Sequence, residues 1–138
     1  MDSHPELVSG SSYMNAKINL LYFYFMKNGY VYILSNFNRT VLYIGMTNNI
    51  EVRILQHKAG IGSSFTSRYN LTDLMYFETF QNITSAIERE KQLKNWHKEW
   101  KWNLIKDQNP RLLDLATDWF DDVDIESVKS GDLNHKHL

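Results

Sequence analysis

The sequence predicts an α/β fold of the α+β kind, in which a small three-stranded, largely antiparallel sheet is flanked by helices. Residues 29–46 contain two short apolar runs, YVYIL and VLYIG, on either side of a polar link, which is typical of a β-hairpin. A third apolar run lies within residues 71–80 and predicts another strand. Helical periodicity occupies the segments that follow. The predicted order is β-β-α-β-α-α, and helices covering a sheet are the expected packing for it.

The first predicted helix follows the hairpin directly. Ile50, Ile54 and Leu55 form an apolar stripe at helical spacing, and Gly60 ends the helix near residue 59. The Gly/Ser-rich segment that comes next, GIGSSFTSRYN, is predicted as an exposed loop.

Two further helices are predicted between residue 83 and Pro110. Apolar residues recur there at helical spacing, and a break near His97 divides the segment. The short apolar piece LLDLATDWF is expected to pack back onto the domain, and the acidic residues after it predict a solvated tail.

The chain length suits one domain with a real core. We predict a leader at residues 1–25, a domain at 26–115, and a short apolar piece with an acidic tail at 116–138. The leader ends near the run INLLYFYFM, which is well short of the ~20 apolar residues that cross a bilayer, so no membrane partner is expected. The absence of cysteine excludes disulfides and thiolate metal sites and agrees with a cytoplasmic location.

Charge is unevenly distributed along this chain, although its net charge is only −1. Residues 27–111 hold twelve Lys/Arg and seven Asp/Glu, whereas residues 112–138 hold two Lys and seven Asp/Glu. A mildly basic body with an acidic end is compatible with binding to nucleic acid. The pattern alone does not require such a partner.

Two polar side chains lie on the apolar face of the first predicted helix. Arg53 and His57 are four residues apart and share a face with Ile50 and Ile54. One interpretation is a functional site. The other is an arginine whose aliphatic stem packs while its head reaches water, beside a hydrogen-bonded histidine.

Glu90 raises the same question on the helix that begins near residue 83. It lies near the centre of an apolar stripe, where a carboxylate is costly unless it is paired, hydrogen-bonded or bound to a cation. An ion pair with Lys94, one turn later, is one interpretation, and a metal ion is the other. The stripe consists of Ile83, Ala86, Ile87 and Leu93.

The hairpin contributes tyrosines. Strand alternation places Tyr30 and Tyr32 on one face, and Tyr43 shares a face with Gly45. Tyr32 and Tyr43 can then be neighbours, with Gly45 leaving room for a ligand beside them. Ordinary aromatic packing across the strands is the alternative.

Two phenols, a guanidinium, an imidazole and a carboxylate form a set that suits metal-assisted phosphodiester hydrolysis, provided that their elements face one sheet surface. Glu90 would hold Mg²⁺, which prefers oxygen ligands and keeps several waters. The ion and Arg53 would stabilise charge on the phosphate. Tyr32, Tyr43 or His57 would orient or deprotonate the attacking water, and the choice among them stays open.

Over residues 27–115 the chain resembles the GIY-YIG nuclease superfamily. Tyr30-Val31-Tyr32 stands where the family has its GIY triplet, and Tyr43-Ile44-Gly45 is a literal YIG. The family's arginine, ten residues after the YIG tyrosine, matches Arg53, and the residue one turn later matches His57.

Two more family positions lie later in the chain. The metal-binding glutamate matches Glu90, and the late asparagine corresponds to Asn109 of an NP pair. The chain is most similar to the small stand-alone bacterial members, which share the run EKQLKNW and a following NP.

The resemblance implies a Mg²⁺- or Mn²⁺-dependent endonuclease that hydrolyses DNA, with residues 26–115 as its nuclease domain. A nucleic-acid-binding module that keeps the fold with little or no cleavage is the alternative. Because nucleases of this family usually borrow DNA affinity from attached domains, a protein partner that supplies specificity is also considered.

Several basic side chains are candidates for contacts with the DNA backbone, which position a nucleic acid without reading its sequence. The alternative is that they simply form a solvated helical face. They are Arg68, Arg89, Lys91, Lys94, Lys98 and Lys101.

Overall fold

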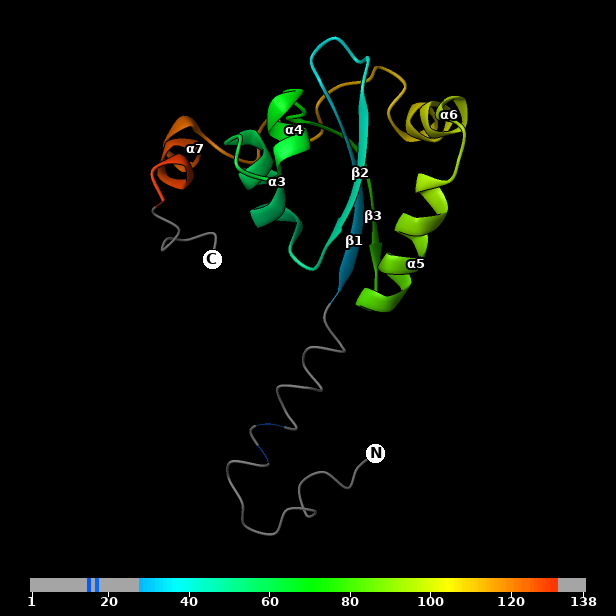
Figure 1. Ribbon diagram of the computed structural model, residues 1–138, viewed down its shortest axis with the longest axis horizontal. Helices are drawn as coiled ribbons and strands as arrows, with labels where there is room; N and C mark the ends of the chain where they lie inside the picture. Colours follow the sequence, from blue (N-terminus) through cyan, green and yellow to red (C-terminus); the bar gives the residue numbers. More distant parts are fainter. Residues whose placement is uncertain (1–14, 16, 18–27, 132–138) are drawn as a thin grey trace.

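The computed structural model, which describes residues 15, 17 and 28–131, is built around a three-stranded antiparallel sheet (Figure 1). Strand β1 (Gly29–Ser35) lies in the centre, between β2 (Leu42–Thr47) and β3 (Asp73–Phe80). The α+β prediction and the hairpin are therefore confirmed. The leader predicted at 1–25 lies outside the described residues except for positions 15 and 17.

The central strand has two apolar faces, as its alternation of side chains requires. Val31 and Ile33 belong to one core cluster, and Tyr32 and Leu34 belong to another. None of the four is more than 1% exposed. Because both faces of the sheet are apolar, each must be covered by helices.

Helices α5 (Ile83–Lys94) and α6 (Lys98–Gln108) cover the face that carries Val31 and Ile33. Asn82 begins α5 by accepting a hydrogen bond from the Ser85 backbone N–H. The two helices are separated at residues 95–97, so the predicted break near His97 is confirmed.

The opposite face is covered by α3 (Ile50–Lys58), whose Ile50 and Ile54 pack against Tyr32 and Leu34. The next segment differs from the predicted exposed loop, because Ser64–Arg68 forms a short helix, α4. Its N-cap is Ser63, whose side chain accepts from the backbone N–H of the buried Thr66. No helix among the described residues is long and apolar enough to cross a membrane.

Residues 122–129 form helix α7 (Asp122–Lys129) instead of the predicted solvated tail. Asp121 and Asp124 make a capping box at its start, so two acidic residues stabilise the helix end they occupy. Val128 then packs with Leu55 and Ala59 of α3. This acidic segment is therefore an amphipathic helix whose apolar face packs against α3.

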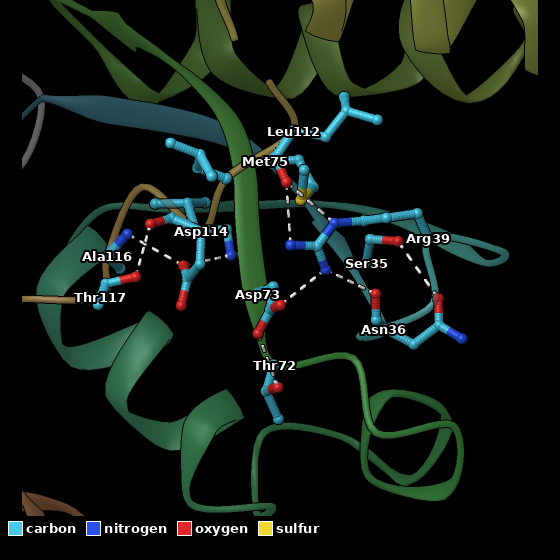
Figure 2. Close-up of polar contacts among 12 residues, drawn as sticks. Ser35, Asn36, Arg39, Thr72, Asp73, Met75, Leu112, Asp114, Ala116 and Thr117 are labelled. Atoms are coloured by element: carbon cyan, nitrogen blue, oxygen red, sulfur yellow. Dashed lines mark hydrogen bonds and ion pairs between the residues drawn. The ribbon is translucent and has the colours of Figure 1, made fainter. Parts of the chain in front are cut away.

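The segment after α6 is tied to the sheet by polar contacts. Arg39, at the end of the hairpin link, donates to the Asp73 carboxylate at 2.6 Å and to the Leu112 carbonyl at 3.0 Å. Figure 2 shows the guanidinium between these two acceptors. Asp114 accepts from the Leu74 backbone N–H at 2.9 Å and pairs with Lys58 of α3 at 2.6 Å. The loop is thereby fixed to both β3 and α3.

Candidate active site

Tyr32 and Tyr43 lie side by side on the sheet face that α3 covers. Tyr32 is opposite Gly45 in the hairpin and Tyr43 is opposite Leu34, so the tyrosines are diagonal neighbours. Their ring centroids are 6.3 Å apart. The predicted room for a ligand at Gly45 is wrong, because a methyl group there would come within 2.5 Å of the Tyr32 hydroxyl. Glycine makes room for the phenols themselves.

The Tyr32 hydroxyl joins three of the predicted site residues. His57 Nε2 lies 2.8 Å from it, and Arg53 Nε donates to it at 3.3 Å. Thr66 Oγ1 donates its proton to the Ser63 carbonyl, so it accepts from His57 Nδ1–H, which leaves Nε2 as the acceptor for the phenol proton. Burial raises the pKa of Tyr32 to about 12, so the phenol keeps this proton at neutral pH.

His57 is 2% exposed and is held neutral. Burial, followed by the positive charge of Arg53, lowers the pKa of His57 to about 4. A neutral imidazole that accepts at Nε2 carries its proton on Nδ1, which then donates to Thr66 Oγ1 at 3.0 Å. Gly62 leaves space for this ring, because a methyl group at residue 62 would collide with Nδ1.

Arg53 and Tyr43 complete the group, which we call the Tyr32 cluster: Tyr32, Tyr43, Arg53 and His57. The half-buried Arg53 also donates through Nη1 to Gln56 at 3.0 Å, which orients its guanidinium. The Tyr43 ring centroid lies 5.8 Å from that of His57. No hydrogen-bond partner for the Tyr43 hydroxyl lies among the described residues, so this phenol can bind a water or a phosphate.

Glu90 comes from the other side of the sheet. The condition that all functional elements face one sheet surface is not met, because α3 and α5 cover opposite faces (Figure 1). The reason is that β1 is apolar on both faces. Glu90 still acts on the Tyr32 cluster, since its negative charge contributes, after burial and Tyr43, to the raised pKa of Tyr32. Helix α5 packs on both β1 and the edge strand β2.

The predicted ion pair of Glu90 with Lys94 is present, at 3.1 Å. The lysine side chain is 52% exposed, and such surface pairs contribute only ~0–1 kcal/mol. Lys94 can therefore leave Glu90 at little cost, and the pair does not prevent the carboxylate from binding a cation.

The side chains near Glu90 suit a divalent cation that takes few of its ligands from the protein. Within the described part of the chain, no three His, Cys, Asp or Glu side chains are grouped so that they could hold a metal ion. Mg²⁺ often needs no such cage, because it takes one or two carboxylates and fills its other positions with waters and substrate phosphate oxygens. Glu90 supplies one such carboxylate, and it acts electrostatically on Tyr32.

Asn109 lies at the end of α6, where its side chain is engaged by backbone groups. It is 5% exposed, and its Nδ2 donates to the carbonyls of Met75 and Leu113 at 3.1 and 2.8 Å. Its Oδ1 accepts from the Leu113 backbone N–H. The amide therefore joins the end of α6 to β3 and to the following loop. This geometry gives Asn109 a positioning role, and the catalytic role that the family match implies for it stays a prediction.

The basic residues predicted to bind nucleic acid are divided between the two sides of the sheet. Arg68 is exposed on α4, whereas Arg89, Lys91 and Lys94 are on α5 and Lys98 is on α6. They do not share one helical face.

Three of these basic residues are already engaged, and one of them is Lys94, which pairs with Glu90. Arg89 makes a two-pronged contact with Glu78, with distances of 2.9 Å from both Nε and Nη2, and such pairs are strong. Its predicted phosphate contact is therefore unsupported. Lys98 donates to the Thr40 carbonyl at 3.0 Å.

Sequence reasoning missed the contribution of α4. Thr66 orients His57, and Phe65 lies against Tyr43 with ring centroids 6.2 Å apart. A signal was present: Ser63 is a good N-cap residue, and Phe65 and Tyr69 have the spacing of one helical turn. The Gly/Ser-rich composition of the segment favoured a loop instead of a helix.

The fold and the Tyr32 cluster define a small α+β domain of the nuclease type. The chain belongs to the GIY-YIG family, because the GIY-YIG catalytic domain matches residues 28–103, more than half of its length. The matched segment runs from the start of β1 into α6 and contains the Tyr32 cluster and Glu90.

The chain is also similar to small relatives. A UPF0213 protein of Natronomonas pharaonis is 35% identical over 79 residues, which cover 57% of this chain and 92% of the relative. A UPF0213 protein of Syntrophus aciditrophicus is 37% identical over 89 residues, covering 64% and 100%. One of Clostridium perfringens is 39% identical over 80 residues, covering 58% and 85%. No solved structure matches the chain.

Proposed function

We propose that this chain is a Mg²⁺- or Mn²⁺-dependent endonuclease that hydrolyses phosphodiester bonds in DNA. The observation that carries the proposal is the Tyr32 cluster, in which one buried hydroxyl contacts both a neutral histidine and an arginine. A structural core has little use for this combination, because each polar group costs free energy to bury. A phosphate reaction uses a cation for the developing charge and a base for the water proton.

Arg53 is the residue that would contact the phosphate. Its guanidinium is half-buried and held by Gln56 and Tyr32, so it is oriented before substrate arrives. Preorganised charge of this kind stabilises the negative charge that develops on the phosphate oxygens. The Tyr43 hydroxyl would hold the attacking water.

Tyr32 and His57 would together accept the proton of that water. The water passes a proton to the Tyr32 oxygen while the phenol passes its own to His57 Nε2, 2.8 Å away. The water oxygen bonds to phosphorus, the bond to the leaving sugar oxygen breaks, and solvent protonates that oxygen. This route avoids a free phenolate, which the raised pKa of Tyr32 disfavours. The phosphate charge beside Arg53 would make His57 a better base.

Glu90 would hold the divalent cation. When bound, such an ion supplies Lewis-acid stabilisation of phosphate oxygens and lowers the pKa of its waters. Glu90 lies within the segment that matches the GIY-YIG catalytic domain and acts electrostatically on Tyr32, and both observations support this role.

The test compares Glu90→Gln with Glu88→Gln, which alters an exposed acid on the same helix. With Mg²⁺ or Mn²⁺ and a set of single-stranded, duplex and branched DNAs, Glu90→Gln should cleave at least ~100-fold more slowly than wild type. Glu88→Gln should cleave like wild type. Thermal unfolding of both variants controls for loss of the fold.

A nucleic-acid-binding module without cleavage is the second candidate, favoured by the ion pair that Glu90 makes with Lys94. The same experiment separates the two. Wild-type protein that binds these DNAs and cuts none of them would establish the second function. If Glu90→Gln cleaves as fast as Glu88→Gln, the assignment of Glu90 is wrong.

A further inference from the structure

A series of aromatic rings leads from the Tyr32 cluster to the surface of α4. Tyr43 and Phe65 are nearly parallel, with ring centroids 6.2 Å apart and an interplanar angle of 29°. Phe65 and Tyr69 follow at 4.9 Å and 52°. Tyr32, Tyr43, Phe65 and Tyr69 therefore form one unbroken series of ring contacts that begins in the candidate active site.

The outer two rings of this series are open to solvent. Phe65 and Tyr69 are each 44% exposed, and neither belongs to the core clusters of the described residues. Phe65 lies on α4 and Tyr69, four residues later, is the C-cap of that helix, so the two rings lie on one side of it. Two partly exposed aromatic rings side by side, next to the candidate active site, offer apolar surface that a ligand can contact.

A positively charged side chain, Arg68, lies next to the exposed rings. The Arg68 guanidinium lies 5.8 Å from the centroid of the Tyr69 ring, and Arg68 is itself exposed. Flat aromatic faces next to an arginine match the two parts of a nucleotide, because a base stacks on a ring while its phosphate pairs with the guanidinium.

We propose that Phe65 and Tyr69, with Arg68, form a stacking platform for unpaired bases, and that the substrate of the neighbouring site is a single-stranded or unpaired segment of DNA. The reason is geometric. In a duplex the faces of the bases are covered by their neighbours, so a protein ring can stack only on bases that have left the helix. This inference rests on the proposed nuclease function and adds the substrate class to it.

The position of the platform connects binding to the chemistry. Thr66 lies between Phe65 and Tyr69 in sequence and contacts His57 Nδ1 at 3.0 Å. One short helix thus presents the rings to solvent and orients the imidazole in the Tyr32 cluster. A base stacked on α4 would place its strand beside Tyr43, the ring next to Phe65.

The test measures binding by fluorescence anisotropy, with EDTA present so that no cleavage occurs. The probes are a labelled oligothymidine of about 16 nucleotides, the upper end of typical site sizes, and a duplex of equal length. Phe65→Leu and Tyr69→Leu remove the flat ring and keep an apolar side chain. Trp100→Leu is the matched control, since Trp100 is 51% exposed on α6, which covers the opposite sheet face.

Each platform variant should weaken single-strand binding by roughly 5- to 100-fold, the range for loss of one base–aromatic stack. Duplex binding should change less than twofold, and Trp100→Leu should change neither. Unchanged single-strand binding in the Phe65→Leu/Tyr69→Leu double variant would overturn the platform, as would an equal loss for both probes.

Failure of this inference and failure of the proposed function give different results. Glu90→Gln should keep the single-strand preference while losing cleavage. If the platform variants bind like wild type and Glu90→Gln is inactive, only the platform is wrong. If single-strand binding falls in the platform variants and Glu90→Gln still cleaves, the platform stands and the Glu90 assignment fails.

Discussion

His57 has surroundings that oppose its charged form. It is buried between the Tyr32 hydroxyl and Thr66, and Arg53 adds a positive charge nearby. A protonated imidazole there would lose its acceptor role toward Tyr32 and repel the guanidinium. The folded protein therefore depends on neutral His57, and acid should weaken it.

The pH dependence follows from the lowered pKa of His57. In the unfolded chain a histidine binds its proton near pH 6.5, and in the folded protein His57 does so near pH 4. Between these values the unfolded state binds more protons at this residue, so the contribution of His57 to the free energy of unfolding should fall by about 3 kcal/mol as the pH drops from 6.5 to 4. Urea unfolding at a series of pH values measures this loss.

His57→Gln should remove that part of the pH dependence, whatever its effect on stability at neutral pH. His97→Gln is the control, because His97 is exposed at the start of α6 and lies outside the Tyr32 cluster. The His97→Gln variant should keep the wild-type dependence of the free energy of unfolding on pH. An equal slope for His57→Gln and wild type would show that His57 does not titrate as its burial requires.

At the scale of elements, the strands and long helices could be predicted because their residues alternate or repeat over many positions. The hairpin, the third strand and the break near His97 all have such local signals. Which face of the sheet α3 and α5 each cover could not be predicted, since β1 is apolar on both sides and neither face is marked by polar residues. The helix α4 was missed because it is only five residues long.

Some site residues could be predicted from the sequence and others could not, for the same reason. The motif residues that share an element, such as Arg53 and His57 on α3, could be placed from spacing alone. Partners from distant elements could not. Glu78 of β3 engages Arg89, and Asn109 satisfies carbonyls of β3 and the loop after α6, which only the folded chain brings together.

Gly45 shows how strand pairing makes the site. It is opposite Tyr32, and a methyl group there would lie 2.5 Å from the Tyr32 hydroxyl. Gly45→Ala should destabilise the fold by roughly 1–3 kcal/mol. It should also slow cleavage by about 100-fold, because small displacements of catalytic groups are costly. Urea unfolding and single-turnover cleavage, at a temperature where the variant is folded, measure the two effects.

Gly29→Ala provides the matched control at the other end of the hairpin. A methyl group there would lie 2.8 Å from the Ala86 side chain of α5 and 2.9 Å from the Asn82 carbonyl, so it crowds a helix instead of the phenols. Its loss of stability should be similar, with little loss of cleavage in the folded variant. Equal cleavage by the two variants would show that Gly45 serves packing alone.

At the scale of the whole molecule, α7 extends the structure beyond the part that defines the family. The GIY-YIG match ends at residue 103, whereas α7 begins at Asp122 and contacts α3. Val128 is 3% exposed in that contact, beside Leu55 and Ala59. Since α3 also carries Arg53 and His57, we infer that α7 stabilises the helix on which half of the Tyr32 cluster depends.

Val128→Asp should therefore reduce stability by roughly 2–5 kcal/mol, because it removes apolar contacts and buries a charge. Val123→Asp places the same charge on α7 at a position that is 72% exposed, and should change stability by less than ~0.5 kcal/mol. Hydrogen exchange should show faster opening of α3 amides in the Val128→Asp variant, with the β1 amides protected longer. If α3 exchanges at the same rate in both variants, α7 is docked on α3 without supporting it.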